Sequence, residues 1–196
     1  MLRAPLPVPR RYRRPGGTCL ALALTGLLLT GCGMTDDNDT SDPPTGTTAP
    51  QIPPAGTAGT EEAVAAVKAV SSQLYDFVGV PGTATAPGPG IRACEGKDPD
   101  TYFRVHHPWS FQPTSGGDND TAMANLKEKL STGGWVVQDS YRDNSPNQNL
   151  NLVADNDAQK VSVWVVAYSK RDTPSIGIEV TSGCYRVPEG QKVQHS

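Results

Sequence analysis

Apolar residues recur three or four positions apart in two segments of the chain, residues 61–78 and 118–132. The recurring residues are Val64, Val67, Leu74, Met123, Leu126 and Leu130. This spacing gathers the apolar side chains on one face of a helix and leaves polar residues on the other. The pattern therefore predicts two helices, each with one buried face.

Residues that begin or end helices flank both segments. Thr60 precedes the first segment, and Asp118 or Asp120 stands at the start of the second, where a side-chain oxygen can cap free backbone N–H groups. Gly79 follows the first segment, and Gly133 or Gly134 follows the second. Glycine readily adopts the left-handed conformation that ends many helices, so the sequence predicts both ends of each helix.

Five further segments alternate apolar and polar residues or are rich in β-branched and aromatic residues, as strands are. They span residues 102–111, 135–141, 150–154, 161–168 and 176–181. Residues 81–90 are rich in proline and glycine and predict a loop. The last four strands follow one another with short polar connections, which predicts an antiparallel meander.

The predicted order is therefore helix, strand, helix and four strands, αβαββββ. Two helices and one sheet bury their apolar faces most simply as two layers. The sequence predicts an α+β fold in which two helices pack on one face of an antiparallel sheet of about five strands. This domain spans residues 61–190, which is long enough to bury a single core. Residues 191–196 are expected to form a frayed tail.

The N-terminus has the pattern of an export signal. Residues 1–18 contain five arginines and no acidic residue, and an apolar run of about eleven residues, Cys19–Leu29, follows. A basic flank, a short apolar run and small residues at its end are typical of a secretory signal peptide. The run is too short to span a membrane, which takes about 20 apolar residues. The sequence predicts a signal peptide over residues 1–31.

The end of the apolar run, Leu29-Thr30-Gly31-Cys32, resembles the lipobox of bacterial lipoproteins. In those proteins the cysteine thiol receives a diacylglyceryl group, and cleavage before the cysteine leaves an acylated N-terminus. The resemblance implies that Cys32 is lipidated and holds the protein on the outer face of the cell membrane. Several acyl chains anchor a protein durably, because each buried CH₂ contributes about 0.8 kcal/mol. An ordinary secretory signal, in which Cys32 has no role, is the alternative.

Residues 32–60 connect this cysteine to the predicted domain. They are rich in Thr, Pro and Asp and contain almost no large apolar residue. Such a composition cannot bury enough surface to offset the entropy lost on ordering. The sequence predicts a disordered tether that spaces the domain from the bilayer.

Removal of the signal peptide makes the chain acidic. The precursor has 17 basic and 20 acidic residues and a net charge of −3. Five of the basic residues and none of the acidic ones lie in residues 1–31, so the mature chain has 12 basic and 20 acidic residues and a net charge of −8. This balance argues against nucleic acid as a partner, since that binding needs a basic surface.

Two cysteines remain once Cys19 is removed with the signal and Cys32 carries lipid. These are Cys94 and Cys184. Exported proteins meet an oxidising environment, so the two are expected to form a disulfide. Two cysteines without a second pair or a suitable histidine make a poor zinc site, and the sequence predicts no metal and no cofactor.

The residues that most resemble a catalytic or metal site have simpler explanations. His106 and His107 are adjacent on a predicted strand, so they point to opposite faces and cannot easily share one metal. One is expected to face solvent and the other to pack beside Trp109. The Asp118-Asn-Asp120 and Asp155-Asn-Asp157 segments lack the glycine and glutamate of a calcium-binding EF-hand. The chain has no nucleophile elbow, phosphate-binding loop or zinc-protease motif.

Several features together resemble small actinobacterial lipoproteins, including the LppA-like kind. They are the Leu29-Thr-Gly-Cys32 lipobox, the Thr/Pro tether, one early helix, Ala93-Cys94, the Ala124–Leu130 helix leading to Gly133-Gly-Trp135, and the closing Ser182-Gly-Cys184-Tyr185. The resemblance implies a cell-surface protein without a known activity. It carries over no catalytic residue.

The sequence favours a lipid-anchored surface protein, not an enzyme, that binds or positions a partner in the cell envelope, either a protein or a wall component. Two alternatives stay open. One is a carrier of an apolar ligand in a pocket between helices and sheet, and the other is an envelope hydrolase with a site built from scattered residues.

Overall fold

A computed structural model describes residues 52–85 and 87–195 of the chain. The predicted signal peptide over residues 1–31, the predicted lipid on Cys32 and most of the predicted tether lie outside the described residues. In the part that is described, no helix is both long and apolar enough to cross a membrane.

Two helices and nine strands form in the described residues. The helices are α1 (Thr60–Val78) and α2 (Asp118–Lys129). The longer strands are β4 (Tyr102–Pro113), β5 (Val136–Arg142), β6 (Leu150–Asn156), β7 (Val161–Tyr168) and β8 (Ser175–Ser182). The short strands are β1 (Gly56–Thr57), β2 (Gly82–Ala84), β3 (Gly90–Ala93) and β9 (Tyr185–Arg186).

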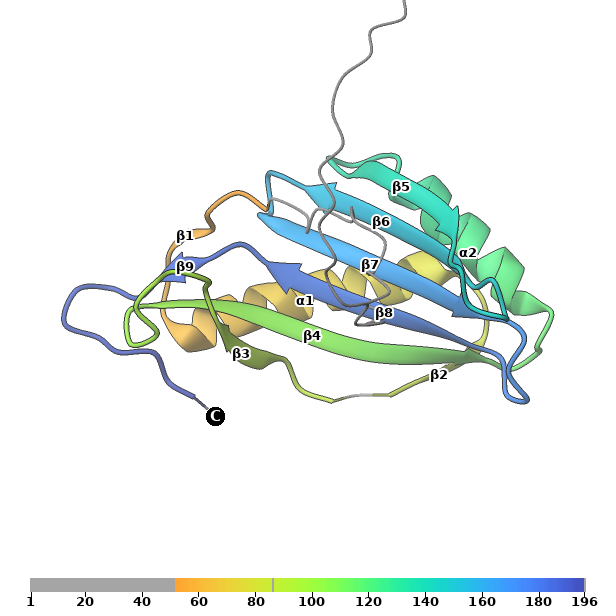
Figure 1. The fold of residues 1–196 in the computed structure, drawn as a ribbon, viewed down its shortest axis with the longest axis horizontal. Coiled ribbons are helices and arrows are strands. Elements are labelled where there is room, and N and C mark those ends of the chain that lie inside the picture. Colours follow the sequence, from red (N-terminus) through yellow and green to blue (C-terminus); the bar gives the residue numbers. More distant parts are fainter. Residues whose placement is uncertain (1–51, 86, 196) are drawn as a thin grey trace, which may run out of the picture. The chain divides into compact units, whose positions relative to one another are not determined.

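All of these strands belong to one sheet. Its path is β1-β9-β4-β8-β7-β6-β5. β9 and β8 pair with successive parts of one edge of β4, and β3 and β2 pair with successive parts of its other edge. Neighbouring strands are antiparallel except β1 and β9, which are parallel. Figure 1 shows both helices behind the sheet, so the opposite face, called the open face below, is turned toward the viewer. The predicted α+β class is confirmed.

The predicted count of about five strands and the order αβαββββ are wrong. The predicted strands are present as β4 to β8, and β5 to β8 form the predicted antiparallel meander. Four short strands add to them, and the order becomes βαβββαβββββ. β2 and the start of β3 lie in residues 81–90, which were predicted to form a loop. Strands of two to four residues are too short to show an alternation of apolar and polar residues. They form because main-chain hydrogen bonds to a neighbouring strand hold them in place, and the sequence does not show these bonds.

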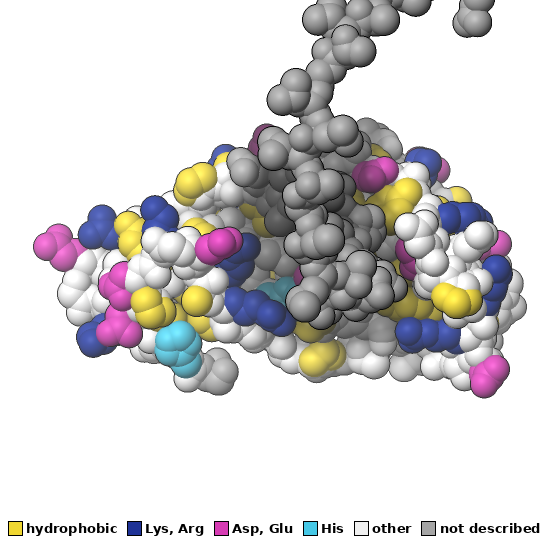
Figure 2. All heavy atoms as spheres, in the orientation of Figure 1, with side chains coloured by type: hydrophobic (Ala, Val, Ile, Leu, Met, Phe, Trp, Pro, Cys, Tyr) yellow, Lys and Arg dark blue, Asp and Glu magenta, His cyan; other side chains and the backbone are white. Residues whose placement is uncertain are grey.

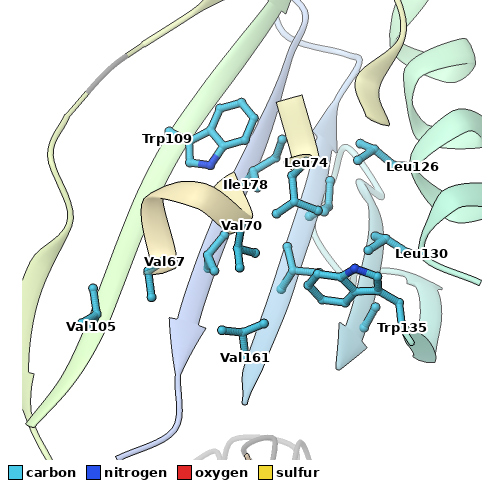
Figure 3. Packing of buried hydrophobic residues seen from close by; sticks show 14 of the residues in the cluster. Val67, Val70, Leu74, Val105, Trp109, Leu126, Leu130, Trp135, Val161 and Ile178 are labelled. Atoms are coloured by element: carbon cyan, nitrogen blue, oxygen red, sulfur yellow. The ribbon is translucent and has the colours of Figure 1, made fainter. Parts of the chain in front are cut away.

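The core lies between the helices and the sheet. Val67, Val70 and Leu74 of α1 are buried, as the helical spacing predicts. The sheet meets them with alternate residues of its strands, such as Val105 of β4 and Ile178 of β8 (Figure 3). Burial of one such side chain contributes about 1.5–3 kcal/mol, so this layer stabilises the fold.

Neither predicted N-terminal cap forms. α1 begins after Gly59 and α2 after Gly117, and no side chain caps either helix. Thr60 is instead the first residue of α1, and its hydroxyl oxygen accepts a hydrogen bond of 3.2 Å from the backbone N–H of Gln194. Thr60 therefore does not cap α1; its side chain connects the first turn of α1 to Gln194.

Glycine ends α1 as predicted. Gly79 has a φ of +64°, in the left-handed region that favours glycine. The side-chain amide of Asn125 in α2 donates a hydrogen bond of 3.0 Å to the carbonyl of Val78. α2 thus satisfies one of the last carbonyl groups of α1 and joins the two helices.

The folded domain begins before residue 61. The N–H of Ala55 donates a hydrogen bond of 2.9 Å to the carbonyl of Cys184, and Ala58 is buried. β1 then pairs with β9. Residues 55–60, which were predicted to belong to the tether, are therefore part of the domain.

The domain also extends beyond residue 190. Val193 is buried, and its N–H donates a hydrogen bond of 3.0 Å to the carbonyl of Asp100. Lys192 forms an ion pair with the Asp100 side chain at 3.0 Å. The expectation of a frayed tail is wrong for residues 191–194, because one apolar side chain and these polar contacts hold them on the domain.

Cys94 and Cys184 form the predicted disulfide, with Cα atoms 6.0 Å apart and a sequence separation of 90 residues. Cys94 directly follows β3, and Cys184 directly precedes β9. These two strands pair with opposite edges of β4. The disulfide therefore connects two short strands on either side of one long strand.

Candidate functional site

A groove of about 240 Å³ lies between α1, β4 and the connection from β2 to β3. It is called the α1–β4 groove below. Its lining residues are Lys68, Ser71, Ser72, Tyr75, Ala84, Thr85, Pro87, Gly88, His107 and Trp109.

Helical and strand periodicity bring these residues together. Lys68, Ser71 and Tyr75 are three and four positions apart, so they lie on one side of α1. His107 and Trp109 are two positions apart on β4 and share the side of the sheet that faces the helices. β2 and β3 pair with β4 on either side of this stretch, so the connection between them forms the outer wall.

Hydrogen bonds hold that wall against β4. The N–H of Thr85 donates to the carbonyl of Ser110, and the N–H of Ser110 donates to the Thr85 hydroxyl oxygen, both at 2.9 Å. Farther along, Nε2 of His107 lies 2.8 Å from the carbonyl oxygen of Pro87. The outer wall is thus attached to the strand at two places.

Ser71 and His107 form a buried hydrogen bond in the floor of the groove. The Ser71 Oγ lies 2.7 Å from Nδ1 of His107, and both side chains are buried. The Pro87 carbonyl can only accept, so Nε2 of the neutral imidazole donates to it and Nδ1 accepts from the Ser71 hydroxyl. One imidazole therefore joins the helix, the strand and the outer wall.

Aromatic rings form one side of the groove. Tyr75 is 45% exposed, and its ring centroid lies 6.4 Å from that of Trp109 and 5.9 Å from that of Phe111. Trp109 is buried, and its indole N–H has no acceptor among the described residues. Exposed aromatic surface beside a groove is a common feature of binding sites.

The Ser71–His107 pair is a poor arrangement for nucleophilic catalysis. Ser71 lies in the interior of α1, where backbone N–H groups bond within the helix and are not free to stabilise an oxyanion. The second nitrogen of His107 bonds a neutral carbonyl, where a catalytic triad has a carboxylate. The geometry fits a structural connection between elements.

The two histidines point to opposite faces of the sheet, as predicted. His107 lines the groove beside Trp109, whereas His106 on the open face contacts Thr181 at 3.2 Å and Glu179 at 3.4 Å. Burial lowers the pKa of His106, and the Glu179 carboxylate opposes this shift only in part. His106 therefore favours its neutral form although a carboxylate is nearby.

The predicted site residues lie apart from the groove. Cys94 and Cys184 are joined in the disulfide between the end of β3 and the start of β9, and Cys32 is outside the described residues. The sequence did not single out Ser71 or Tyr75. The signal at Ser71 is its place on the apolar face of α1, because a buried hydroxyl needs a partner. Nothing in the sequence indicates that Tyr75 stays exposed.

No cluster of three or more His, Cys, Asp or Glu side chains in the described residues is suited to hold a metal ion. No protein-family model, curated protein or solved structure matches the chain.

Proposed function

We propose that the chain is an exported lipoprotein of the LppA-like kind, held by lipid on Cys32 at the outer face of the cell membrane, whose domain binds an envelope protein in the α1–β4 groove. The anchor rests on the Leu29-Thr30-Gly31-Cys32 sequence at the end of a short apolar run. The binding role rests on the exposed ring of Tyr75 beside an apolar groove.

The size of the groove favours a protein partner over a carried ligand. Pockets that enclose small molecules usually measure about 300–1,000 Å³, and this groove, at about 240 Å³, is smaller. A space of this size suits one large apolar side chain of a partner, and such single anchors dominate many protein interfaces. Among the described residues of the lining, Lys68 is the one with a charged side chain, so the occupant is expected to be an uncharged segment.

The anchor is tested by fractionation of cells that produce the Cys32→Ala variant. Lipid anchoring predicts that this variant leaves the membrane fraction, while the unchanged protein remains in it. Retention of the variant in the membrane, with the signal peptide processed as before, would contradict the proposal.

The partner is tested with a photo-crosslinking amino acid on intact cells. Placed at Ser72, an exposed position in the groove, it is expected to capture one protein; placed at Lys129, on the exposed side of α2, it is not. Tyr75→Ala should abolish the Ser72 product while thermal melting shows a folded domain. The same product at both positions, its persistence in Tyr75→Ala, or no product at Ser72 would overturn the binding role.

A serine-reactive phosphonate probe tests whether the protein is an enzyme. A role in binding without catalysis predicts no labelling of the full chain. Labelling that is lost in Ser71→Ala would show instead that Ser71 is a nucleophile and that the protein is a hydrolase.

A further inference from the structure

Three arginines from three neighbouring strands lie on the open face of the sheet. Arg92 of β3 and Arg104 of β4 are paired in register, and Arg186 of β9 pairs with Tyr102, two residues before Arg104. Directly paired residues have Cβ atoms about 4.5–5.5 Å apart, so like charges there repel each other. Figure 2 shows Lys and Arg side chains gathered beside a histidine on this face.

No carboxylate of the described residues neutralises these charges. The ion pairs within 4.0 Å in this part of the chain are His106–Glu179 and Lys192–Asp100, and neither includes an arginine. Glu179 is the one acidic residue on β3, β4, β8 and β9, and it pairs with Pro108. Pro108 is four residues from Arg104, a distance of about 13 Å along a strand.

Acidic residues of the adjoining loops are engaged elsewhere or stand apart. Asp98 accepts hydrogen bonds from the Thr101 hydroxyl and from the N–H of Asp100. The Asp100 side chain pairs with Lys192. Glu95 and Glu189 are exposed and form no ion pair with the arginines.

The disulfide holds the three arginines in place. Cys94 is two residues after Arg92, and Cys184 is two residues before Arg186, so the bridge fixes both outer strands. Nη2 of Arg104 lies 3.6 Å from the Sγ of Cys184, and its Nε is buried without an acceptor among the described residues. The guanidinium of the middle strand is thus packed against the bridge that joins its neighbours.

We propose that Arg92, Arg104 and Arg186 bind a phosphate group. Guanidinium groups donate paired hydrogen bonds to phosphate oxygens, and the negative charge of the phosphate group offsets the repulsion among several of them. The mature chain is acidic overall, so short-range hydrogen bonds have to supply the affinity. β1 is the first strand of the domain after the proposed tether in the sequence, and it pairs with β9. Under the proposed lipid anchor, the group can come from a phospholipid headgroup or from free phosphate.

The test uses the lipidated full-length protein in an uncharged detergent. Inorganic phosphate is titrated into it by calorimetry in a chloride buffer, and in parallel the micelles are doped with phosphatidylglycerol or with phosphatidylcholine. Arg92→Gln and Arg186→Gln change exposed side chains, and thermal melting checks that each variant is folded. Arg171→Gln is the matched control, because Arg171 lies in the connection between β7 and β8 and stacks on the ring of Tyr168.

A hydrogen bond to a charged group contributes substantially to the binding free energy, so loss of one arginine should weaken phosphate binding by about tenfold or more. Phosphate binding that weakens in both variants and not in Arg171→Gln establishes a site for free phosphate groups. Binding to phosphatidylglycerol alone, weakened by the same variants, establishes a headgroup site. Absence of binding in both titrations, or equal binding by all variants, overturns the proposal.

Discussion

The Ser71 hydroxyl and the His107 imidazole lie 2.7 Å apart and join α1 to β4 beneath the groove. Both side chains are buried, so neither can exchange its partner for bulk water. The geometry of the groove depends on this bond, because the same imidazole also holds the Pro87 carbonyl at 2.8 Å.

Removal of the Ser71 hydroxyl should therefore destabilise the domain. Ser71→Ala leaves a buried ring nitrogen without a donor, which costs about 1–3 kcal/mol, measured as the free energy of unfolding in urea. Ser72→Ala is the control, since its hydroxyl is exposed and bonds the Lys68 carbonyl within the helix; a change within about 0.5 kcal/mol is expected there. Equal effects in the two variants would show that the Ser71–His107 bond contributes little.

The disulfide should supply a large part of the stability. A closed loop of this length stabilises a protein by about 4–5 kcal/mol in the chain-entropy model, and Cys94 and Cys184 are 90 residues apart. Reduced protein and a Cys94→Ala, Cys184→Ala double variant should lose this amount equally in urea unfolding. Mature protein that is unfolded without a reducing agent should also show no free thiol toward a thiol reagent. Two reactive thiols would contradict the disulfide.

The long elements were predictable from sequence because each shows its own periodicity. The apolar stripe of α1 and the alternation of β8 reappear in the structure as buried faces, and the apolar run of β7 is buried along nearly its whole length. β1, β2, β3 and β9 were not predictable, because pairing with distant strands and not their own side chains keeps them extended. The order of the strands in the sheet was not predictable for the same reason: β8 pairs with β4 although α2 and three strands separate them in the sequence.

The groove was beyond sequence reasoning for a related reason. Ser71, Pro87 and His107 meet only because α1, the β2–β3 connection and β4 pack together. His107 and Trp109 were predicted to share a face, and they do. The exposure of Tyr75 depends on how much of α1 the connection from β2 to β3 covers, and the sequence around Tyr75 does not indicate this.

The loop between β5 and β6 should lose stability in acid. Asp143 accepts hydrogen bonds from the side chain and N–H of Ser145 and from Asn149, and these lower its pKa to about 2 from 3.8. A lowered carboxylate pKa stabilises the folded state above the unfolded pKa, and this contribution is lost as pH falls from about 4 toward 2. Hydrogen exchange at the Asn149 amide should accelerate over this range relative to other loop amides, and Asp143→Asn should remove the dependence. An unchanged profile in that variant would rule out Asp143 as the cause.

His106 should make the sheet sensitive to milder acid. Burial lowers its pKa below 6.5, so the unfolded chain binds a proton that the folded chain resists. The folded state is then stabilised above about pH 6.5 and loses this contribution as pH falls through the lowered pKa. The urea midpoint should fall between about pH 7 and 5, and less so in His106→Gln. His195→Gln is the control; a profile altered there and not in His106→Gln would contradict the assignment.

Gly183 should be required where the chain enters the domain. A Cβ at this position would lie far inside contact distance of the Pro53 carbonyl oxygen and against the N–H of Ala55, and backbone atoms cannot move aside as a flexible side chain can. Gly183→Ala should therefore displace the segment before β1 and weaken the bond from the Ala55 N–H to the Cys184 carbonyl. Overpacking of this kind costs about 1–3 kcal/mol, and hydrogen exchange at Ala55 should accelerate more than in the core of β7.

Gly88→Ala, where nothing lies within 4 Å of the new methyl group, should leave the hydrogen exchange of Ala55 unchanged. Equal exchange at Ala55 in both variants would show that the segment before β1 adjusts to the methyl group without losing its place on the domain.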